Sequence, residues 1–190
     1  MDIYDVILSR RTIRRFKQKH IKLELLRKII NAARVAPSAA NLQPLEYIVA
    51  NKKELCDRIF ETLGWAGYIK PKWSPAKNER PTAYIIILVR KDISKYYKWD
   101  EGLSAENIML TAESLNIGTC MILNVNREEL RKILDIPDSF IISSVIALGY
   151  KAEISVIEDI KDSVKYWRDE EEVLHVPKRR LDDIMHINGF

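Results

Sequence analysis

Glycine and cysteine are both scarce in this chain of 190 residues. Its six glycines form neither a GxGxxG nor a GxxxxGKS/T loop, so the sequence has no backbone loop of the kind that cradles phosphate. Cys56 and Cys120 are the only cysteines, too few and too far apart for a disulfide framework. We therefore expect side chains to hold any bound phosphate, and we predict a reducing, cytoplasmic location.

Long apolar runs and clustered histidines are missing as well. No run approaches the ~20 apolar residues that cross a bilayer, and an N-terminus with Asp2 and Asp5 does not resemble a signal peptide. His20, His175 and His186 lie far apart, and none has a partner at the spacing of metal ligands. We expect no membrane association and no metal site.

The composition is that of an ordinary globular protein, with 47% hydrophobic and 31% charged residues. This length predicts one domain, residues 1–190, with its core over about residues 1–152 and a tail over about residues 153–190. The net charge of +4 is well below that of a nucleic-acid-binding arm. A nucleic-acid-binding module that uses residues 10–19 is therefore a remote alternative, and we expect no nucleic-acid partner.

Positive charge is concentrated in two short segments at opposite ends of the chain. Arginine binds phosphate through a planar fork and stays charged at any working pH. A solvated basic turn would explain one such cluster, but two of them favour a single anion held between the N- and C-terminal segments. The members are Arg10, Arg11, Arg14 and Arg15 in the first segment, and Lys178, Arg179 and Arg180 in the second.

Apolar periodicity predicts five helices and four strands, which alternate without a strict βαβ rhythm. The helices are expected over residues 2–9, 23–34, 52–63, 102–116 and 127–135. The strands are expected over residues 45–50, 84–89, 119–123 and 140–148. We predict an α+β layered domain.

Two stretches lack this periodicity. Residues 64–81 read as a long loop, in which Trp65 and Trp73 serve either a lid or attachment of the loop to the core. Residues 155–176 are polar and acidic with few apolar anchors, so we expect a second subunit to hold them. Asn107, inside the predicted core helix, needs a hydrogen-bond partner if it is buried.

The sequence APSAANLQP, residues 36–44, places small and amide side chains between two prolines. The amides of Asn41 and Gln43 suit the edge of a planar heterocycle, and their small neighbours permit close approach. The sequence around these residues offers no paired carboxylates for acid–base catalysis.

Three segments together resemble the nitroreductase family of FMN-dependent oxidoreductases. RRTIRRF at residues 10–16 is similar to the family's RRSxRxF motif, and APSAANLQP to its APSxxNxQP loop. HVPKRRL at residues 175–181 is similar to its C-terminal PKxRL segment. The resemblance implies a central mixed or antiparallel sheet flanked by helices, and a homodimer in which the tail is swapped onto the partner.

The resemblance also implies which residues contact FMN. Arg10, Lys178 and Arg180 would hold its phosphate, while Arg11 and Thr12 would contact the phosphate and ribityl chain. Arg14 would lie near the pyrimidine edge of the flavin. A second contacting segment would comprise Pro37, Ser38, Asn41 and Gln43. Backbone groups of a third segment would line the other flavin face: Met121, Ile122, Leu123 and Asn124.

The implied activity is an FMN-dependent oxidoreductase that uses NADH or NADPH to reduce a small electron-poor acceptor, such as a nitroaromatic or a quinone, by a ping-pong mechanism. The flavin would carry the chemistry, with no catalytic side chain. A flavin-binding redox sensor and a flavin-consuming or dehalogenating enzyme remain alternatives within the family.

Overall fold

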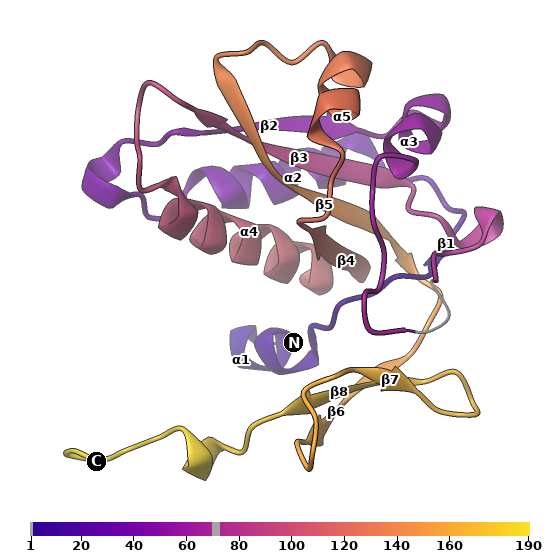
Figure 1. The fold of residues 1–190 in the computed structure, drawn as a ribbon, viewed down its shortest axis with the longest axis vertical. Coiled ribbons are helices and arrows are strands. Elements are labelled where there is room, and N and C mark those ends of the chain that lie inside the picture. Colours follow the sequence, from indigo (N-terminus) through magenta and orange to yellow (C-terminus); the bar gives the residue numbers. More distant parts are fainter. Residues whose placement is uncertain (1, 70–72) are drawn as a thin grey trace.

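The computed structural model describes residues 2–69 and 73–190 of the chain. Its largest element is a five-stranded sheet in which every pairing is antiparallel, which decides between the mixed and antiparallel expectations (Figure 1). The strands are β1 (Phe16–Lys17), β2 (Leu45–Ala50), β3 (Ala83–Arg90), β4 (Ile117–Ile122) and β5 (Phe140–Lys151). The predicted α+β class is confirmed.

Strand β5 lies at the centre of this sheet and pairs with β1, β3 and β4. Tyr150 of β5 faces Lys17 of β1 on one edge and Ile117 of β4 on the other. The short strand β1 and the strand β4 therefore lie on opposite sides of β5. Strand β2 reaches the sheet through its pairing with β3.

Both faces of the sheet are buried, which explains the unbroken apolar run in β3. Its side chains alternate between two core clusters, with Tyr84 and Ile86 in one and Ile85 and Ile87 in the other. In the described part of the chain the two faces are covered by α2 (Leu23–Arg34), α3 (Lys53–Phe60), α4 (Tyr97–Ser114) and α5 (Arg127–Leu134), while α1 (Ile3–Ser9) packs against α4. Helices α2 and α4 pack into one cluster, and α3 and α5 into the other.

Two helix boundaries differ from the predictions. Helix α4 begins at Tyr97 instead of near residue 102, because Asp100 in its first turn and Glu101 directly after it break the apolar pattern, although both are buried. Acidic residues in the first turn are favoured by the helix dipole. Helix α3 ends at Phe60 instead of near residue 63, because Leu63 is drawn into an antiparallel bridge with Val125.

The side chain of Asn107 is partly buried and has a hydrogen-bond partner. Its Nδ2 donates to the backbone oxygen of Ala32 at 3.0 Å, which joins α4 to α2 on the same face of the sheet. None of the helices in the described part of the chain is both long and apolar enough to span a membrane.

The predicted loop over residues 64–81 includes residues 70–72, which lie outside the described residues. Within its described part, the Trp65 ring stacks on Phe60 with centroids 5.4 Å apart, so this tryptophan attaches the loop to the core. A short 3-10 helix follows at Lys77–Glu79.

The tail folds into a second, three-stranded sheet that was not predicted, although residues 155–176 have few apolar anchors. Strand β8 (Leu174–Lys178) pairs in parallel with β6 (Ser155–Asp159) and antiparallel with β7 (Trp167–Arg168). The His175 ring stacks on Trp167 with centroids 4.3 Å apart. These contacts are largely polar or aromatic, so apolar periodicity did not indicate them. A 3-10 helix at Leu181–Asp183 follows the sheet.

Candidate functional site

The arginine-rich segment crosses β4 and β5 at a pair of glycines. Gly118 and Gly149 face each other in the pairing of these strands. A Cβ atom on Gly118 would lie 2.8 Å from Ile13 Cβ, and one on Gly149 would lie 2.7 Å from Phe16 Cβ. Only glycine therefore lets residues 13–16 approach the sheet this closely.

Backbone hydrogen bonds fix the direction of the same segment. Thr12 forms a parallel bridge with Thr119 of β4, and the Ile13 N–H donates to the Thr119 oxygen at 2.9 Å. The Arg11 and Arg14 side chains on either side of this bridge are partly buried. Thr12 therefore lies beside β4 at Thr119, which precedes the predicted third segment at residues 121–124 by two positions.

A buried carboxylate from the start of the tail holds the segment on its other side. The Glu153 side chain is 2% exposed and accepts the N–H groups of Arg14 and Arg15, the latter at 3.1 Å. Its second oxygen pairs with the guanidinium of Arg168 in the small sheet. Glu153 thus attaches both the arginine segment and the tail to the end of β5.

The side chains of Arg10 and Arg11 give this region its positive charge. Arg10 Nε lies 3.6 Å from Glu106 Oε1, a loose pair with a half-exposed carboxylate. Arg11 donates to the backbone oxygens of Leu8, at 2.6 Å, and of Arg10. Its buried Nε has no hydrogen-bond partner in the described residues. Burial and the neighbouring Arg10 charge lower the pKa of Arg11.

Arg14 points toward the tail. Its guanidinium carbon lies 4.4 Å from the centre of the Tyr166 ring, and that ring packs against Tyr68 with centroids 5.1 Å apart. The same guanidinium lies near the Cys120 thiol. Burial raises the pKa of this thiol to about 11, although Arg14 acts in the opposite direction. Cys120 is consequently a thiol, not a thiolate nucleophile, at neutral pH.

The proline-fenced loop has an uncommon backbone. Ala40, Asn41 and Gln43 all have positive φ, at 49°, 55° and 52°. Non-glycine residues seldom adopt this region, and such strain persists only where surrounding contacts hold it. The exposed side chains of Asn41 and Gln43 are joined, because Gln43 Nε2 donates to Asn41 Oδ1 at 3.2 Å.

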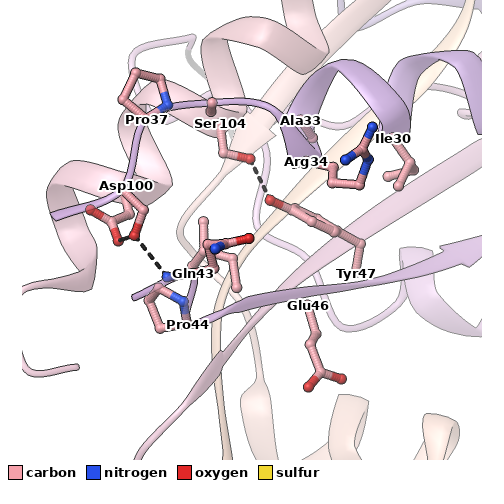
Figure 2. Close-up of a pocket in the computed structure, with 13 residues that line it drawn as sticks. Ile30, Ala33, Arg34, Pro37, Gln43, Pro44, Glu46, Tyr47, Asp100 and Ser104 are labelled. Atoms are coloured by element: carbon pink, nitrogen blue, oxygen red, sulfur yellow. Dashed lines mark hydrogen bonds between the residues drawn. The ribbon is translucent and has the colours of Figure 1, made fainter. Parts of the chain in front are cut away.

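A cavity of about 390 Å³ lies behind this loop, between α2, β2 and α4 (Figure 2). Predicted residues Pro37, Ser38 and Gln43 line it, together with Asp100 and Tyr47. The Tyr47 hydroxyl points at Ser104, with the two oxygens 2.6 Å apart. Desolvation raises the pKa of Tyr47, so this hydroxyl keeps its proton at neutral pH.

The predicted third segment lies at the end of β4 and divides between several surroundings. Met121 and Leu123 line a second cavity, of about 440 Å³, with Glu101 and Arg127. The Ile122 side chain points into the core on the other face. Asn124 packs over Gly64, whose N–H donates to the Asn124 oxygen at 2.9 Å.

The C-terminal basic residues lie beyond the small sheet. Lys178 ends β8, Arg179 donates to the Asp183 oxygen at 2.6 Å, and Arg180 Nε lies 3.3 Å from Asp159 Oδ2. Within one chain the two basic clusters have different carboxylate partners, because Arg10 pairs with Glu106 and Arg180 with Asp159.

Sequence reasoning missed four residues that organise this region. Asp100 and Glu101 have one detectable signal, because they are adjacent acids shortly before the apolar positions of the predicted core helix. Glu101 accepts the hydroxyls of Ser143 and Ser144, both at 2.5 Å. Glu153 and Tyr166 have no sequence signal of their own. The sequence around the proline-fenced loop offers no paired carboxylates, and the structure places one distant carboxylate, Asp100, against this loop.

Comparison with known proteins decides the family. The model of the nitroreductase family matches residues 7–150. This chain belongs to the nitroreductase family. The match spans the arginine segment, the proline-fenced loop, β4 and most of β5, so the predicted family and enzyme class are confirmed.

Relatives within the nitroreductase family cover most of this chain. A protein of Methanothermobacter thermautotrophicus, provisionally named NADH dehydrogenase/NAD(P)H nitroreductase, is 31% identical over 169 residues, covering 85% of this chain and 84% of the relative. One of the same provisional name from Archaeoglobus fulgidus is 35% identical over 153 residues, covering 76% and 83%.

Solved structures of the nitroreductase family share the fold. The FMN-dependent nitroreductase of Clostridium difficile R20291 aligns with a TM-score of 0.70 at 23% identity, covering 97% of this chain and 98% of that one. A nitroreductase family protein from Clostridium difficile 630 aligns over 100% of both chains with a TM-score of 0.71 at 18% identity.

Proposed function

We propose that this chain is an FMN-dependent oxidoreductase that oxidises NADH or NADPH and then reduces an electron-poor acceptor, such as a nitroaromatic or a quinone, in a ping-pong cycle. The observation that carries the proposal is the arginine segment itself. Glycines, the bridge to Thr119 and Glu153 hold it against β4, with Arg10 loosely paired and a buried Arg11 Nε unpartnered.

The phosphate of FMN fits this cation set. Arg10 would exchange its loose Glu106 contact for a charge-assisted bond to phosphate, and Arg11 would supply its unpartnered Nε. Thr12 lies next along the segment and would contact the ribityl chain. Lys178 and Arg180 are exposed and would complete the phosphate site once the tail is in its assembled position.

The isoalloxazine ring would be held by the other two predicted segments. Gln43 Nε2 is occupied by Asn41, which leaves the Asn41 Nδ2 donor and the Gln43 Oε1 acceptor available in the exposed part of the loop. One donor beside one acceptor complements the carbonyl and N–H edge of a pyrimidine ring. Pro37 and Ser38 would add loop contacts, and backbone groups from Met121 to Asn124 would line the opposite face.

FMN, when bound, supplies the hydride and electron chemistry, and the chain supplies position and charge. Arg14 is the side chain best placed to offset negative charge on the pyrimidine ring, because its guanidinium rests on the Tyr166 ring without a carboxylate partner in the described residues. The buried Cys120 thiol takes no nucleophilic role in this scheme, since its pKa is raised to about 11.

A homodimer would complete the site. Apolar side chains stay exposed on α1, which packs against α4, and on α4 itself: Ile3, Tyr4, Ile7, Leu8, Trp99 and Leu103. More lie along the chain after the small sheet: Leu181, Ile184, Met185, Ile187 and Phe190. A second copy of the chain would cover both sets, with the tail swapped onto the partner and two equivalent sites.

A titration of the purified protein with FMN tests the cofactor. We expect flavin fluorescence to be quenched on binding and the visible absorbance to bleach when NADH or NADPH is added. Arg10→Glu should weaken FMN binding at least tenfold. Arg58→Glu, the same charge change on the exposed face of α3, should leave it unchanged. A protein that takes up no FMN would refute the proposal.

Reductive dehalogenation is a second candidate, favoured by one relative. Iodotyrosine deiodinase of Thermotoga neapolitana is 23% identical over 165 residues, covering 78% of this chain and 88% of that enzyme. A screen of nitroaromatic, quinone and halogenated phenol acceptors against NADH oxidation separates the two candidates. Turnover confined to halogenated phenols, with release of halide, would select the second.

A further inference from the structure

Asp100 is a buried carboxylate whose described partners are neutral. Its residue is 3% exposed, in the first turn of α4. One oxygen accepts the Ser38 hydroxyl at 2.5 Å, and the other accepts the Ala39 N–H at 3.0 Å. No ion pair with a lysine or arginine occurs for it in the part of the chain that the structure describes. A carboxylate is rarely buried without a cation, so both bonds are needed to retain it.

Both of these bonds go to the proline-fenced loop, where the strained backbone lies. Residues 40, 41 and 43 have positive φ, and Asp100 accepts hydrogen bonds from the two residues just before them. These two bonds restrain the loop. Figure 2 shows Asp100 beside the cavity wall formed by Gln43 and Pro44. Helix α4 is part of the core, so the two hydrogen bonds of Asp100 restrain the loop by attaching it to a rigid element.

The Ser38 hydroxyl links Asp100 to the far side of the loop by a second hydrogen bond. A serine hydroxyl has one proton and two lone pairs. The proton is donated to Asp100, and one lone pair accepts the Gln43 N–H at 2.9 Å. The Ser38 side chain is therefore occupied within the chain, and any Ser38 donor to the flavin must be its backbone N–H.

We propose that Asp100 is a positioning residue for the flavin: through the Ser38 hydroxyl and the Ala39 N–H, it holds the loop in the shape that presents the Asn41 and Gln43 amides. The proposal rests on the proposed function for the identity of the ligand. The restraint of the loop by Asp100 is a property of the chain alone and can be measured without FMN.

Asp100→Ala, Asp100→Asn and Ser38→Ala test the proposal by two measurements. In the FMN-free protein, hydrogen exchange at the Ala39 and Gln43 amides should accelerate at least tenfold in Asp100→Ala, with exchange in β3 unchanged. FMN should bind about tenfold more weakly, while kcat at saturating FMN stays within twofold, as expected for a loop that orients the cofactor. Asp100→Asn should retain part of both properties, since its amide still offers one acceptor.

Ser38→Ala breaks the same link from a half-exposed position, so it addresses the case in which Asp100→Ala does not fold. The two changes should not be additive: the double variant should bind FMN no more weakly than Asp100→Ala. Asp57→Ala, which removes a carboxylate from an exposed i,i+4 pair on α3, is the control and should change neither measurement.

Each result decides one part of the proposal. Unchanged hydrogen exchange at the Ala39 and Gln43 amides in Asp100→Ala and Ser38→Ala would refute the restraint of the loop by Asp100. Accelerated exchange with unchanged FMN affinity would refute the role toward the flavin. A wild-type chain that takes up no FMN would refute the proposed function and the flavin role together. Amide hydrogen exchange would still show whether Asp100 restrains the loop.

Discussion

Gly118 and Gly149 face each other across β4 and β5, and residues 13–16 lie over both. We expect Gly149→Ala to destabilise the fold by about 1–3 kcal/mol, because the new methyl group collides with Phe16 in a packed region. Urea unfolding measures this effect. Gly67→Ala meets no atom within 4 Å and should stay within about 0.5 kcal/mol of the wild type. Equal effects at both positions would contradict the crossing.

Glu153 should be far more sensitive than an exposed partner of the same arginine segment. Glu153→Gln leaves the buried Arg168 guanidinium without its carboxylate, and losing one partner of a buried pair costs about 3–5 kcal/mol. Glu172→Gln removes a pair with Arg15 in which the glutamate side chain is exposed, and should cost about 0–1 kcal/mol. Denaturant titration of both variants makes the comparison. Similar losses would show that Glu153 does not hold the segment.

The small tail sheet should loosen as the pH rises above the ordinary pKa of histidine, about 6.5. The pKa of His175 is raised by its hydrogen bond to Asp169, with a further contribution from Glu158. The pKa values of both carboxylates are lowered. A raised pKa in the folded state adds stability below the ordinary histidine value, about 6.5, and this stability is lost as the pH passes the raised value. The carboxylate contribution is lost only when the pH falls through their lowered values.

Hydrogen exchange in residues 155–178, followed from about pH 6 to about pH 8.5, measures this loosening after correction for intrinsic exchange rates. His175→Gln should remove most of the pH dependence, because the amide does not titrate. Trp167 remains available to stack in this variant. A wild-type profile that is flat over the same range would contradict the role of His175.

Residues 179–190 should carry dimerisation separately from the small sheet. A chain that ends at Lys178 keeps β6, β7 and β8 but loses Ile184, Met185, Ile187 and Phe190, all exposed in one chain. We expect it to sediment as a monomer and to bind FMN weakly. Full-length Arg180→Ala should weaken FMN binding while remaining dimeric, which separates the lost cation from the lost apolar contacts. A truncated chain that stays dimeric would exclude this segment as the dimerising element.

The sequence was informative where chemistry is carried by neighbouring residues. The arginine segment and the proline-fenced loop stand out because their side chains are clustered within a few positions, and the long strands because both of their faces are apolar. Asp100 and Glu153 could not be found in this way. Asp100 bonds Ser38, 62 positions away, and Glu153 bonds the Arg14 N–H, 139 positions away, so only the fold shows these pairs.

The start of α4 and the small tail sheet were missed for a related reason. Both depend on charged or aromatic contacts, such as Asp100 with Ser38 and His175 with Trp167, and an apolar pattern does not register these. A partner for Asn107 could be expected because an amide that is removed from water needs a hydrogen bond, but only the fold shows that the acceptor is the Ala32 oxygen.

The central place of β5 sets the order in which this protein can form during synthesis. Strands β1 and β4 pair with β5, and β2 with β3, so the β2–β3 pair is the largest piece of the main sheet available before residues 140–151 leave the ribosome. Until then the edges of β3 and β4 that pair with β5 are unpaired. Residues 13–16 can pack over Gly118 but not yet over Gly149. The nascent chain therefore passes through a stage with exposed strand edges, at which it is most prone to aggregate and cannot yet retain a ligand.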